Sequence, residues 1–183
     1  MAILKVALLG DPVLRRKAAP VSRAMLRSTA FRRLVADMTA TMKEYDGAGL
    51  AGPQVREGLR VVVVGSEGNP RYPDTPGFPL RVMVNPVVRA LTGRRVGFWE
   101  GCLSVPGLRG LVRRPGRVMV AYTDMQGRRH SFVADRFCAV AVQHEVDHLD
   151  GKLYVDRLVG TRHLSYEREY ARHFAPAEKD KAG

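Results

Sequence analysis

Residues 136–149 read RFCAVAVQHEVDHL, a run that is apolar on every side in its first half and carries two histidines and two carboxylates in its second. The segment predicts one helix, with Asp135 as its N-terminal cap and Gly151 as the left-handed residue just beyond its end. A helix that is apolar all round belongs in a protein core. We therefore expect the rest of the fold to be arranged around residues 136–149.

The second half of this helix has the spacing of a metal site. His144 and His148 stand four residues apart, so both imidazoles lie on one helix face and can reach the same ion. Glu145 is rotated by about 100° from His144, which places its carboxylate beside the metal, where it can hold and deprotonate an attacking water. The HExxH motif thus predicts a mononuclear metal hydrolase with Glu145 as its general acid and base.

The third protein ligand of such a site decides the class of enzyme. Tyr154 stands where proteases of the HExxHxxGxxH type have a third histidine. Glu167 or Glu169 could serve as the downstream ligand of a metallo-endopeptidase, although both lie in a charged segment that is typical of a solvated helix face. Cys102 is a further candidate, but a lone cysteine is more often a small core residue than a ligand. The residues alone leave these candidates open.

Outward from the helix, strand-like runs alternate with turns. Valine-rich or alternating segments predict strands at 60–65, 81–84, 117–122 and 130–133. Prolines and glycines gather at 66–79 and 106–116, where we expect irregular loops. One amphipathic helix is expected over 22–45, capped by Ser22, and another over 158–174.

Strands grouped between helices indicate an α+β fold. We expect a single domain of residues 1–183, with mainly antiparallel β-sheets around the buried central helix and an N-terminal amphipathic helix. Residues 158–183 are expected to form a basic C-terminal helix and tail.

The composition indicates where the protein works and with which partners. Two cysteines are too few for a disulfide framework, and no run of about 18 apolar residues could span a membrane, so we expect a cytoplasmic protein that does not act at a membrane. The formal charge of +12 favours loose association with a polyanion such as the ribosome. The arginines come in scattered pairs without interleaved aromatic residues, so sequence-specific recognition of nucleic acid is not expected.

Three segments, in their order along the chain, carry a resemblance to a known family. They are GAGLAGPQ at 47–54, EGCLSVP at 100–106 and QHEVDH at 143–148. Their order and separation resemble the three signature motifs of the peptide deformylases, and the likeness covers most of the chain up to about residue 157. The resemblance implies an enzyme that removes the N-formyl group from the initiator methionine of nascent polypeptides, so its substrate would be an N-formylmethionyl peptide.

The resemblance also assigns roles to individual residues. The implied ligands of one divalent metal ion are Cys102, His144 and His148. Fe(II) is the implied working ion, and Zn(II), Ni(II) or Co(II) also suit one thiolate with two imidazoles. Catalysis would rest on Glu145 for proton transfer and on the Gln54 side-chain amide and the Leu103 backbone N–H for stabilising negative charge on the formyl oxygen. The implied substrate-binding residues are Gly47, Ala48, Gly49, Glu100, Arg109, Val140 and Ala141.

One departure from the family stands in the first motif, where relatives usually have alanine and this chain has Gly52. The residues with a chemical role are all present, so an active enzyme is expected. Two hypotheses compete with a deformylase. One is a metallo-endopeptidase whose third ligand is Glu167 or Glu169, and the other is a ribosome-binding module without catalysis, which rests only on the positive charge.

Overall fold

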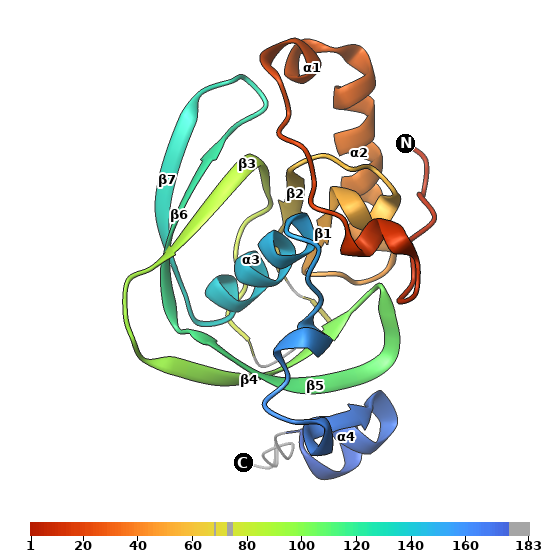
Figure 1. The fold of residues 1–183 in the computed structure, drawn as a ribbon, viewed down its shortest axis with the longest axis vertical. Coiled ribbons are helices and arrows are strands. Elements are labelled where there is room, and N and C mark those ends of the chain that lie inside the picture. The colour runs from red at the N-terminus through yellow and green to blue at the C-terminus, as the bar shows by residue number, and fades with distance from the viewer. Residues whose placement is uncertain (68, 73–74, 176–183) are drawn as a thin grey trace, which may run out of the picture.

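Eight strands form two antiparallel sheets in the computed structural model, which describes residues 1–67, 69–72 and 75–175. The first sheet has the order β1-β2-β3-β6-β7 and the second has the order β4-β5-β8 (Figure 1). The strands of the first sheet are β1 (Gly49–Ala51), β2 (Val61–Val64), β3 (Arg81–Ala90), β6 (Arg117–Thr123) and β7 (Arg129–Asp135). Those of the second are β4 (Arg95–Cys102), β5 (Val105–Pro115) and β8 (Leu164–Tyr166). The predicted mixed fold with antiparallel sheets is confirmed.

The helix α3 (Arg136–Leu149) crosses the middle of the molecule, with β3, β6 and β7 on one side and β4 and β5 below it in the view of Figure 1. Its apolar half is buried against the first sheet. Asp135 occupies the N-cap position, but its side chain makes no capping hydrogen bond, so the predicted side-chain cap is wrong. Gly151 has the expected positive φ, 71°. A Cβ there would lie 2.5 Å from the Arg15 carbonyl oxygen, so only glycine fits.

Strand β2 contributes to two layers of the hydrophobic core. All four of its valines are buried, and because successive side chains leave a strand on opposite faces, they serve different layers. Val62 and Val64 pack in the cluster that contains the apolar residues of α3. Val61 and Val63 pack against α2 (Thr29–Glu44) on the other face. The first sheet is therefore covered by a helix on each side of β2.

The predicted helix over 22–45 is wrong as a single element. The chain forms α1 (Arg23–Arg27) and then α2, separated at Ser28. The Ser28 hydroxyl donates to the Met25 carbonyl at 2.8 Å and accepts from the Phe31 N–H at 3.1 Å, so this side chain ends one helix and begins the next. Serine side chains compete in this way with the helical backbone. Ser22 caps α1 as expected, accepting from the Met25 N–H.

The predicted loop at 106–116 is also wrong, because β5 occupies most of it, pairing with β4 over 110–115 and with β8 over 108–110. The prolines lie next to the ends of this strand, at 106 and 115, where they disturb few ladder hydrogen bonds. Gly110 lies where the Leu158 and Tyr154 side chains pack closely over the strand, so a Cβ there would force them to shift. The glycines and prolines that suggested a loop are explained by close packing and by strand ends.

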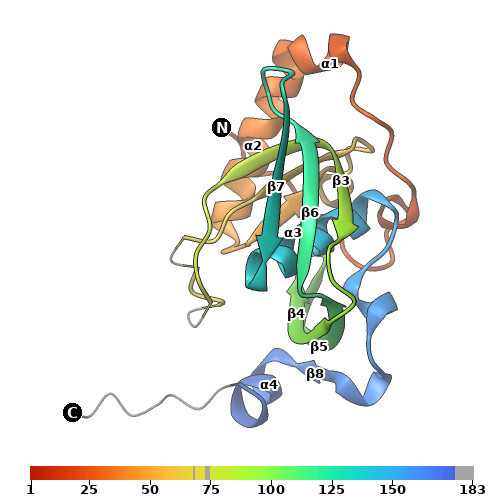
Figure 2. The same ribbon diagram turned by 90° about the vertical axis from the view of Figure 1, so that its left-hand side faces the viewer.

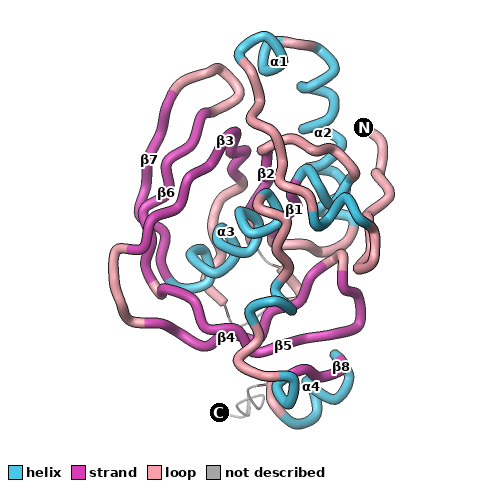
Figure 3. Tube along the Cα trace, in the orientation of Figure 1, coloured by secondary structure: helices cyan, strands magenta, loops and turns pink. Residues whose placement is uncertain are grey.

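The C-terminal segment is helical only in part. After the 3-10 turns η3 (Tyr154–Arg157) and η4 (Thr161–His163), strand β8 pairs with β5, and α4 covers Glu167–His173 alone. Figures 2 and 3 show β8 and α4 lying along the outer side of the β4–β5 pair. The predicted tail lies largely outside the described residues. No helix in the described part of the chain is long and apolar enough to cross a membrane.

Candidate metal centre

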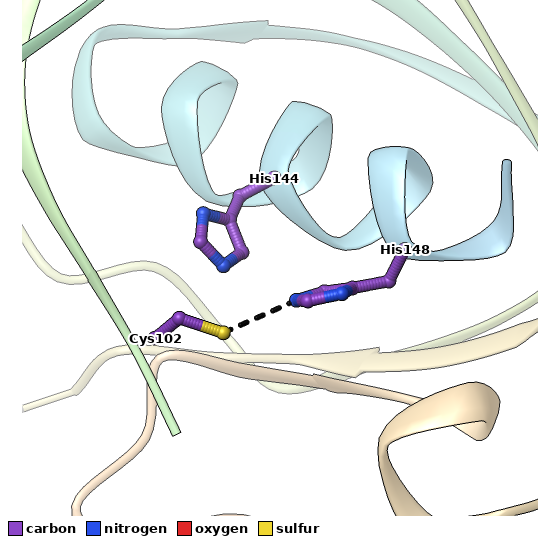
Figure 4. Close-up of side chains that lie close together, drawn as sticks. All are labelled: Cys102, His144 and His148. Carbon is purple, nitrogen blue, oxygen red and sulfur yellow. Dashed lines mark hydrogen bonds between the residues drawn. The ribbon is translucent and has the colours of Figure 1, made fainter. Parts of the chain in front are cut away.

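Three buried side chains converge where the end of β4 meets α3. The ligand atoms of Cys102, His144 and His148 all lie within 4.8 Å of one another, and Cys102 Sγ lies 3.3 Å from His148 Nε2 (Figure 4). Two atoms bound to one ion at about 2.0–2.3 Å in a tetrahedral site lie roughly 3.3–3.6 Å apart. The distance from Cys102 to His148 lies in this range, and the donor set of one thiol and two imidazoles suits a single divalent cation.

Glu100 and Arg114 hold His144 in place. His144 Nδ1 shares a 2.7 Å hydrogen bond with Glu100 Oε2, which leaves its Nε2 for a metal. Arg114 donates to the two oxygens of Glu100 at 2.6 and 2.9 Å and to Asp147 at 2.7 Å. All these groups are buried. Burial alone would raise the pKa of Glu100, but the hydrogen bonds from His144 and Arg114 outweigh it and lower that pKa.

The two histidines differ in their electrostatic surroundings. Burial lowers the pKa of His148 well below its usual range, and the neighbouring charge of His144 acts in the same direction. For His144, burial is opposed by hydrogen bonds to Cys102 and Glu100, which hold its pKa well above the usual value. His148 is thus a neutral imidazole near pH 7, the form that binds metals.

Glu145 lies beside the three ligands on α3 and is 4% exposed. Burial raises its pKa to about 7, and its Oε2 has no hydrogen-bond partner among the described residues. A Cβ on Gly49 would lie 2.4 Å from Glu145 Oε1, so strand β1 can pass this carboxylate only because it has glycine there. The free oxygen and the pKa near neutrality suit a proton acceptor.

The segment GAGLAGPQ at 47–54 places Gln54 beside the metal centre. Its Oε1 accepts from the Ala51 N–H at 2.8 Å, so its Nε2 faces Ser104 Oγ at 3.2 Å and Cys102 Sγ at 3.5 Å. Gln54 lies in the 3-10 turn η2 (Gly52–Val55). A Cβ on Gly52 would lie 2.6 Å from the Leu59 carbonyl oxygen, so the 57–59 loop leaves no room for a methyl group at this position. The hydrogen bonds to Ala51 and Ser104 hold Gln54 in place.

A narrow cavity of about 40 Å³ opens beside these groups. It has room for roughly three water-sized groups. Apolar walls come from Ala48, Phe98, Leu103, Phe137, Val140 and Ala141, and polar ones include Gln54, Glu100, His144 and Glu145. Gly47 and Gly49 line it as well. The structure thus brings together all the residues expected at the site except Arg109.

Glu100 and Arg109 both pair with other groups of the protein. Both were expected to bind substrate, but both carboxylate oxygens of Glu100 are already engaged by Arg114 and His144. Arg109 is buried and donates to Glu167 and to the Arg71 carbonyl oxygen. Sequence reasoning missed Arg114, whose partners lie 14 and 33 residues away and give no local signal.

The glutamates considered as a third ligand lie elsewhere. Glu167 pairs with Arg109 and Arg71, and Glu169 pairs with residues of its own helix. Among the described residues, the group that could hold a metal ion consists of Cys102 and the two histidines. This geometry does not favour the metallo-endopeptidase reading.

An HExxH helix joined by a buried cysteine from a neighbouring sheet defines the class of protein, a metal-dependent hydrolase. A family model described as polypeptide deformylase matches residues 3–163. The chain belongs to the peptide deformylase family.

Individual relatives agree with this assignment. The chain is 42% identical over 170 residues to the peptide deformylase of Leptospira biflexa, covering 92% of this chain and 95% of that protein. It is 47% identical to peptide deformylase 2 of Bordetella bronchiseptica, over 86% of each. The Met-Ala-Ser-bound crystal structure of a class I type b peptide deformylase from Acinetobacter baumannii aligns with a TM-score of 0.83 at 45% identity, covering 86% of this chain and 99% of that one.

Proposed function

We propose that this enzyme removes the N-formyl group from the initiator methionine of nascent polypeptides by metal-dependent hydrolysis, releasing formate. The observation that carries the proposal is the convergence of Cys102, His144 and His148 next to the unpartnered carboxylate oxygen of Glu145. Family membership supports the reaction, and the Met-Ala-Ser peptide bound to the Acinetobacter relative supports a peptide substrate. We also propose the cytoplasm as its place of work, since nascent chains arise there.

The proposed metal is one divalent ion held by the Cys102 thiolate and the two imidazoles. Fe(II) is our choice for the working ion, with Zn(II), Ni(II) or Co(II) as other occupants, because this mixed soft and borderline donor set suits all of them. When bound, such an ion supplies Lewis acidity that makes a water molecule acidic enough to attack at neutral pH.

The residues around the metal site supply proton transfer and stabilise the negative charge that develops. Glu145 takes a proton from the attacking water, whose oxygen bonds to the formyl carbon. The negative charge that develops on the formyl oxygen is stabilised by the Gln54 Nε2 and by the backbone N–H of Leu103. As the carbon–nitrogen bond breaks, Glu145 returns the proton to the departing amine, so the products are formate and a free N-terminal methionine.

The narrow cavity suits the methionine side chain. Its room for about three water-sized groups matches the terminal CH₂–S–CH₃ of methionine, and Ala48, Val140 and Ala141 supply apolar walls. Strand β1 lies at one edge of the first sheet, so its outer backbone groups can pair with an extended peptide. We propose that Gly47 and Gly49 allow this close approach.

Glu100 is proposed as a positioning residue rather than a substrate ligand. It fixes the ring of His144 while Arg114 neutralises it. Glu100 then contacts the substrate only as part of the lining of the narrow cavity.

A formate-release assay tests the proposal. Enzyme purified without oxygen and analysed for metal content should release formate from formyl-Met-Ala-Ser. The Glu145→Gln variant should keep its metal and lose at least about 10²-fold in turnover. Full turnover in that variant would refute the mechanism, and unchanged metal content in Cys102→Ala would refute the ligand set.

Ribosome association is a second proposal, supported by the net charge of +12. Arg23, Arg27, Arg32 and Arg129 line one cavity of about 790 Å³ at the α1 end of the molecule, and its lining contains no acidic residue. Co-sedimentation with ribosomes should weaken steeply as salt rises. Binding that is absent at low salt would exclude this partner.

A further inference from the structure

Glu167, the first residue of α4, lies against two arginines near the active site. Its Oε1 accepts from Arg109 Nε at 3.1 Å and from Arg109 Nη2 at 2.9 Å, and lies 3.5 Å from Arg71 Nη2. One carboxylate oxygen therefore serves two guanidinium groups. Residues 164–173, which form β8 and α4, lie beyond the 3–163 range that matches the family model. This ion pair therefore joins the C-terminal segment to strand β5 and to Arg71.

The ion pair borders a second cavity, which we call the exit cavity. The exit cavity has a volume of about 410 Å³ and is lined by Cys102, Leu103, Arg71 and Glu167, among others. Arg71 and Leu103 also line the narrow cavity, so the two cavities adjoin. A peptide whose methionine fills the narrow cavity can extend its following residues through the exit cavity.

Cys102 and Glu167 both line the exit cavity, so a peptide that runs from the metal centre through this cavity passes Glu167. An extended chain advances about 3.3 Å per residue, so the carboxylate of a tripeptide such as formyl-Met-Ala-Ser lies roughly 10 Å from its first residue. Arg71 lines both cavities and is the guanidinium that such a carboxylate would meet. Glu167 pairs with Arg71 and with the buried Arg109 behind it.

Two aromatic rings hold the Arg109 side chain in position beside Glu167. The Arg109 guanidinium lies over the Tyr72 ring at 4.8 Å and over the Tyr170 ring at 5.3 Å, and its side chain is 6% exposed. Trp99 stacks on Phe174 with ring centroids 4.9 Å apart, which fastens α4 to β4. A guanidinium fixed in this way binds a carboxylate strongly, and Glu167 already supplies one.

We propose that Glu167 acts as an internal competitor for the C-terminal carboxylate of short peptides. By pairing with Arg109 and Arg71, it removes the cationic site that would otherwise retain a finished tripeptide. A growing polypeptide has no carboxylate at its third residue, so the competition does not affect it. The inference rests on the proposed function and deepens it: the favoured substrate is a long formylmethionyl chain.

The test compares two substrates that differ only in charge, formyl-Met-Ala-Ser with a free carboxylate and the same peptide as its C-terminal amide. We expect Glu167→Gln to lower the KM of the free acid by about two- to fivefold, the range of a partly exposed ion pair. The KM of the amide should change less than twofold. Glu169→Gln, on the same helix but paired with Arg172, should match the wild type for both peptides.

The inference would be overturned if Glu167→Gln left the ratio of the two KM values, free acid to amide, unchanged. An equal change in both KM values would show a general disturbance of the site and not an effect of the peptide's charge. Binding of the products, Met-Ala-Ser and its amide, measured by calorimetry on the metal-loaded protein, gives a readout independent of turnover. Absence of formate release from all variants would count against the proposed function, while the ratio of the two product affinities would still decide the role of Glu167.

Discussion

Replacing Gly52 with alanine adds a single methyl group, and we expect this small change to damage the enzyme. The added Cβ would lie 2.6 Å from the Leu59 carbonyl oxygen and 2.8 Å from that of Glu57. Both atoms belong to the backbone of a tight loop, in which the Glu57 N–H donates to the Gly52 carbonyl at 3.0 Å. The loop therefore has no flexible side chain that could simply turn away.

The size of the effect follows from these distances. An ordinary contact needs about 3.4 Å, so the two carbonyls must move by roughly 0.6–0.8 Å, and overpacking of this kind costs about 1–3 kcal/mol. For a domain of this size, each kcal/mol lowers the melting temperature by about 2–4 °C, so we expect a loss of roughly 2–12 °C. Because Gly52 begins the turn that carries Gln54, turnover should also fall by about tenfold to hundredfold.

Thermal unfolding and formate release measured on the same preparations test this reasoning. Gly58→Ala is the matched control, since a Cβ at that position meets no atom within 4 Å and its φ is not positive. We expect that control to stay within about 0.5 kcal/mol of the wild type. If Gly52→Ala has the same melting temperature as the control and keeps full turnover, the idea that the 57–59 loop fills the space beside Gly52 is wrong.

Three further substitutions probe the site and its support. Gly49→Ala should reduce formate release at least about 100-fold with the metal retained, because its Cβ would overlap the Glu145 carboxylate; normal turnover would contradict this. Arg114→Met removes the guanidinium that two buried carboxylates share, so Glu100 keeps only His144 and Asp147 keeps only the partly exposed Arg157, and the free energy of unfolding in urea should fall by about 3–5 kcal/mol; a loss below 1 kcal/mol would show that these remaining partners suffice. Hydrogen bonds from His130 and nearby groups outweigh desolvation and hold the pKa of Asp124 well below its usual range. Its stabilising effect is therefore complete above the unfolded pKa of about 4 and is lost as pH falls through the folded value. The difference in melting temperature between Asp124→Asn and wild type should therefore stay constant from pH 7 to about 4 and shrink below that, whereas a difference that stays constant below about pH 4 would exclude this carboxylate as the cause.

The spacing of residues in the sequence predicted those features that depend on a single helix, strand or turn. His144 and His148 share a face of α3 because they are four residues apart, and the valines of β2 are buried where a valine run suggested a strand. The turn glycine at 151 was predictable for the same reason, since a helix end needs a left-handed residue. These features follow from the backbone geometry of a single element.

Features that depend on contacts between distant segments were not predictable in this way. β8 is a strand because it completes the edge of β5, with Leu108 opposite Tyr166, although its own sequence belongs to a segment that reads as an amphipathic helix. Arg114 and Glu100 find each other across the β4–β5 pair, and neither carries a local sign of burial. Cys102 entered the predicted ligand set through family resemblance, because its own surroundings in the sequence favoured a core residue.

The structure explains why the cysteine and its neighbouring carboxylate occur together. Glu100 and Cys102 are two residues apart at the end of β4, a spacing that sends both side chains from one face of a strand. The face of α3 that they meet carries His144 and His148 one turn apart, so Glu100 reaches the first imidazole while Cys102 approaches the second. A shift of β4 by one residue would turn both side chains away from the helix together. The register irregularity between Glu100 and Cys102, at the turn into β5, is therefore part of what sets the geometry of the metal centre.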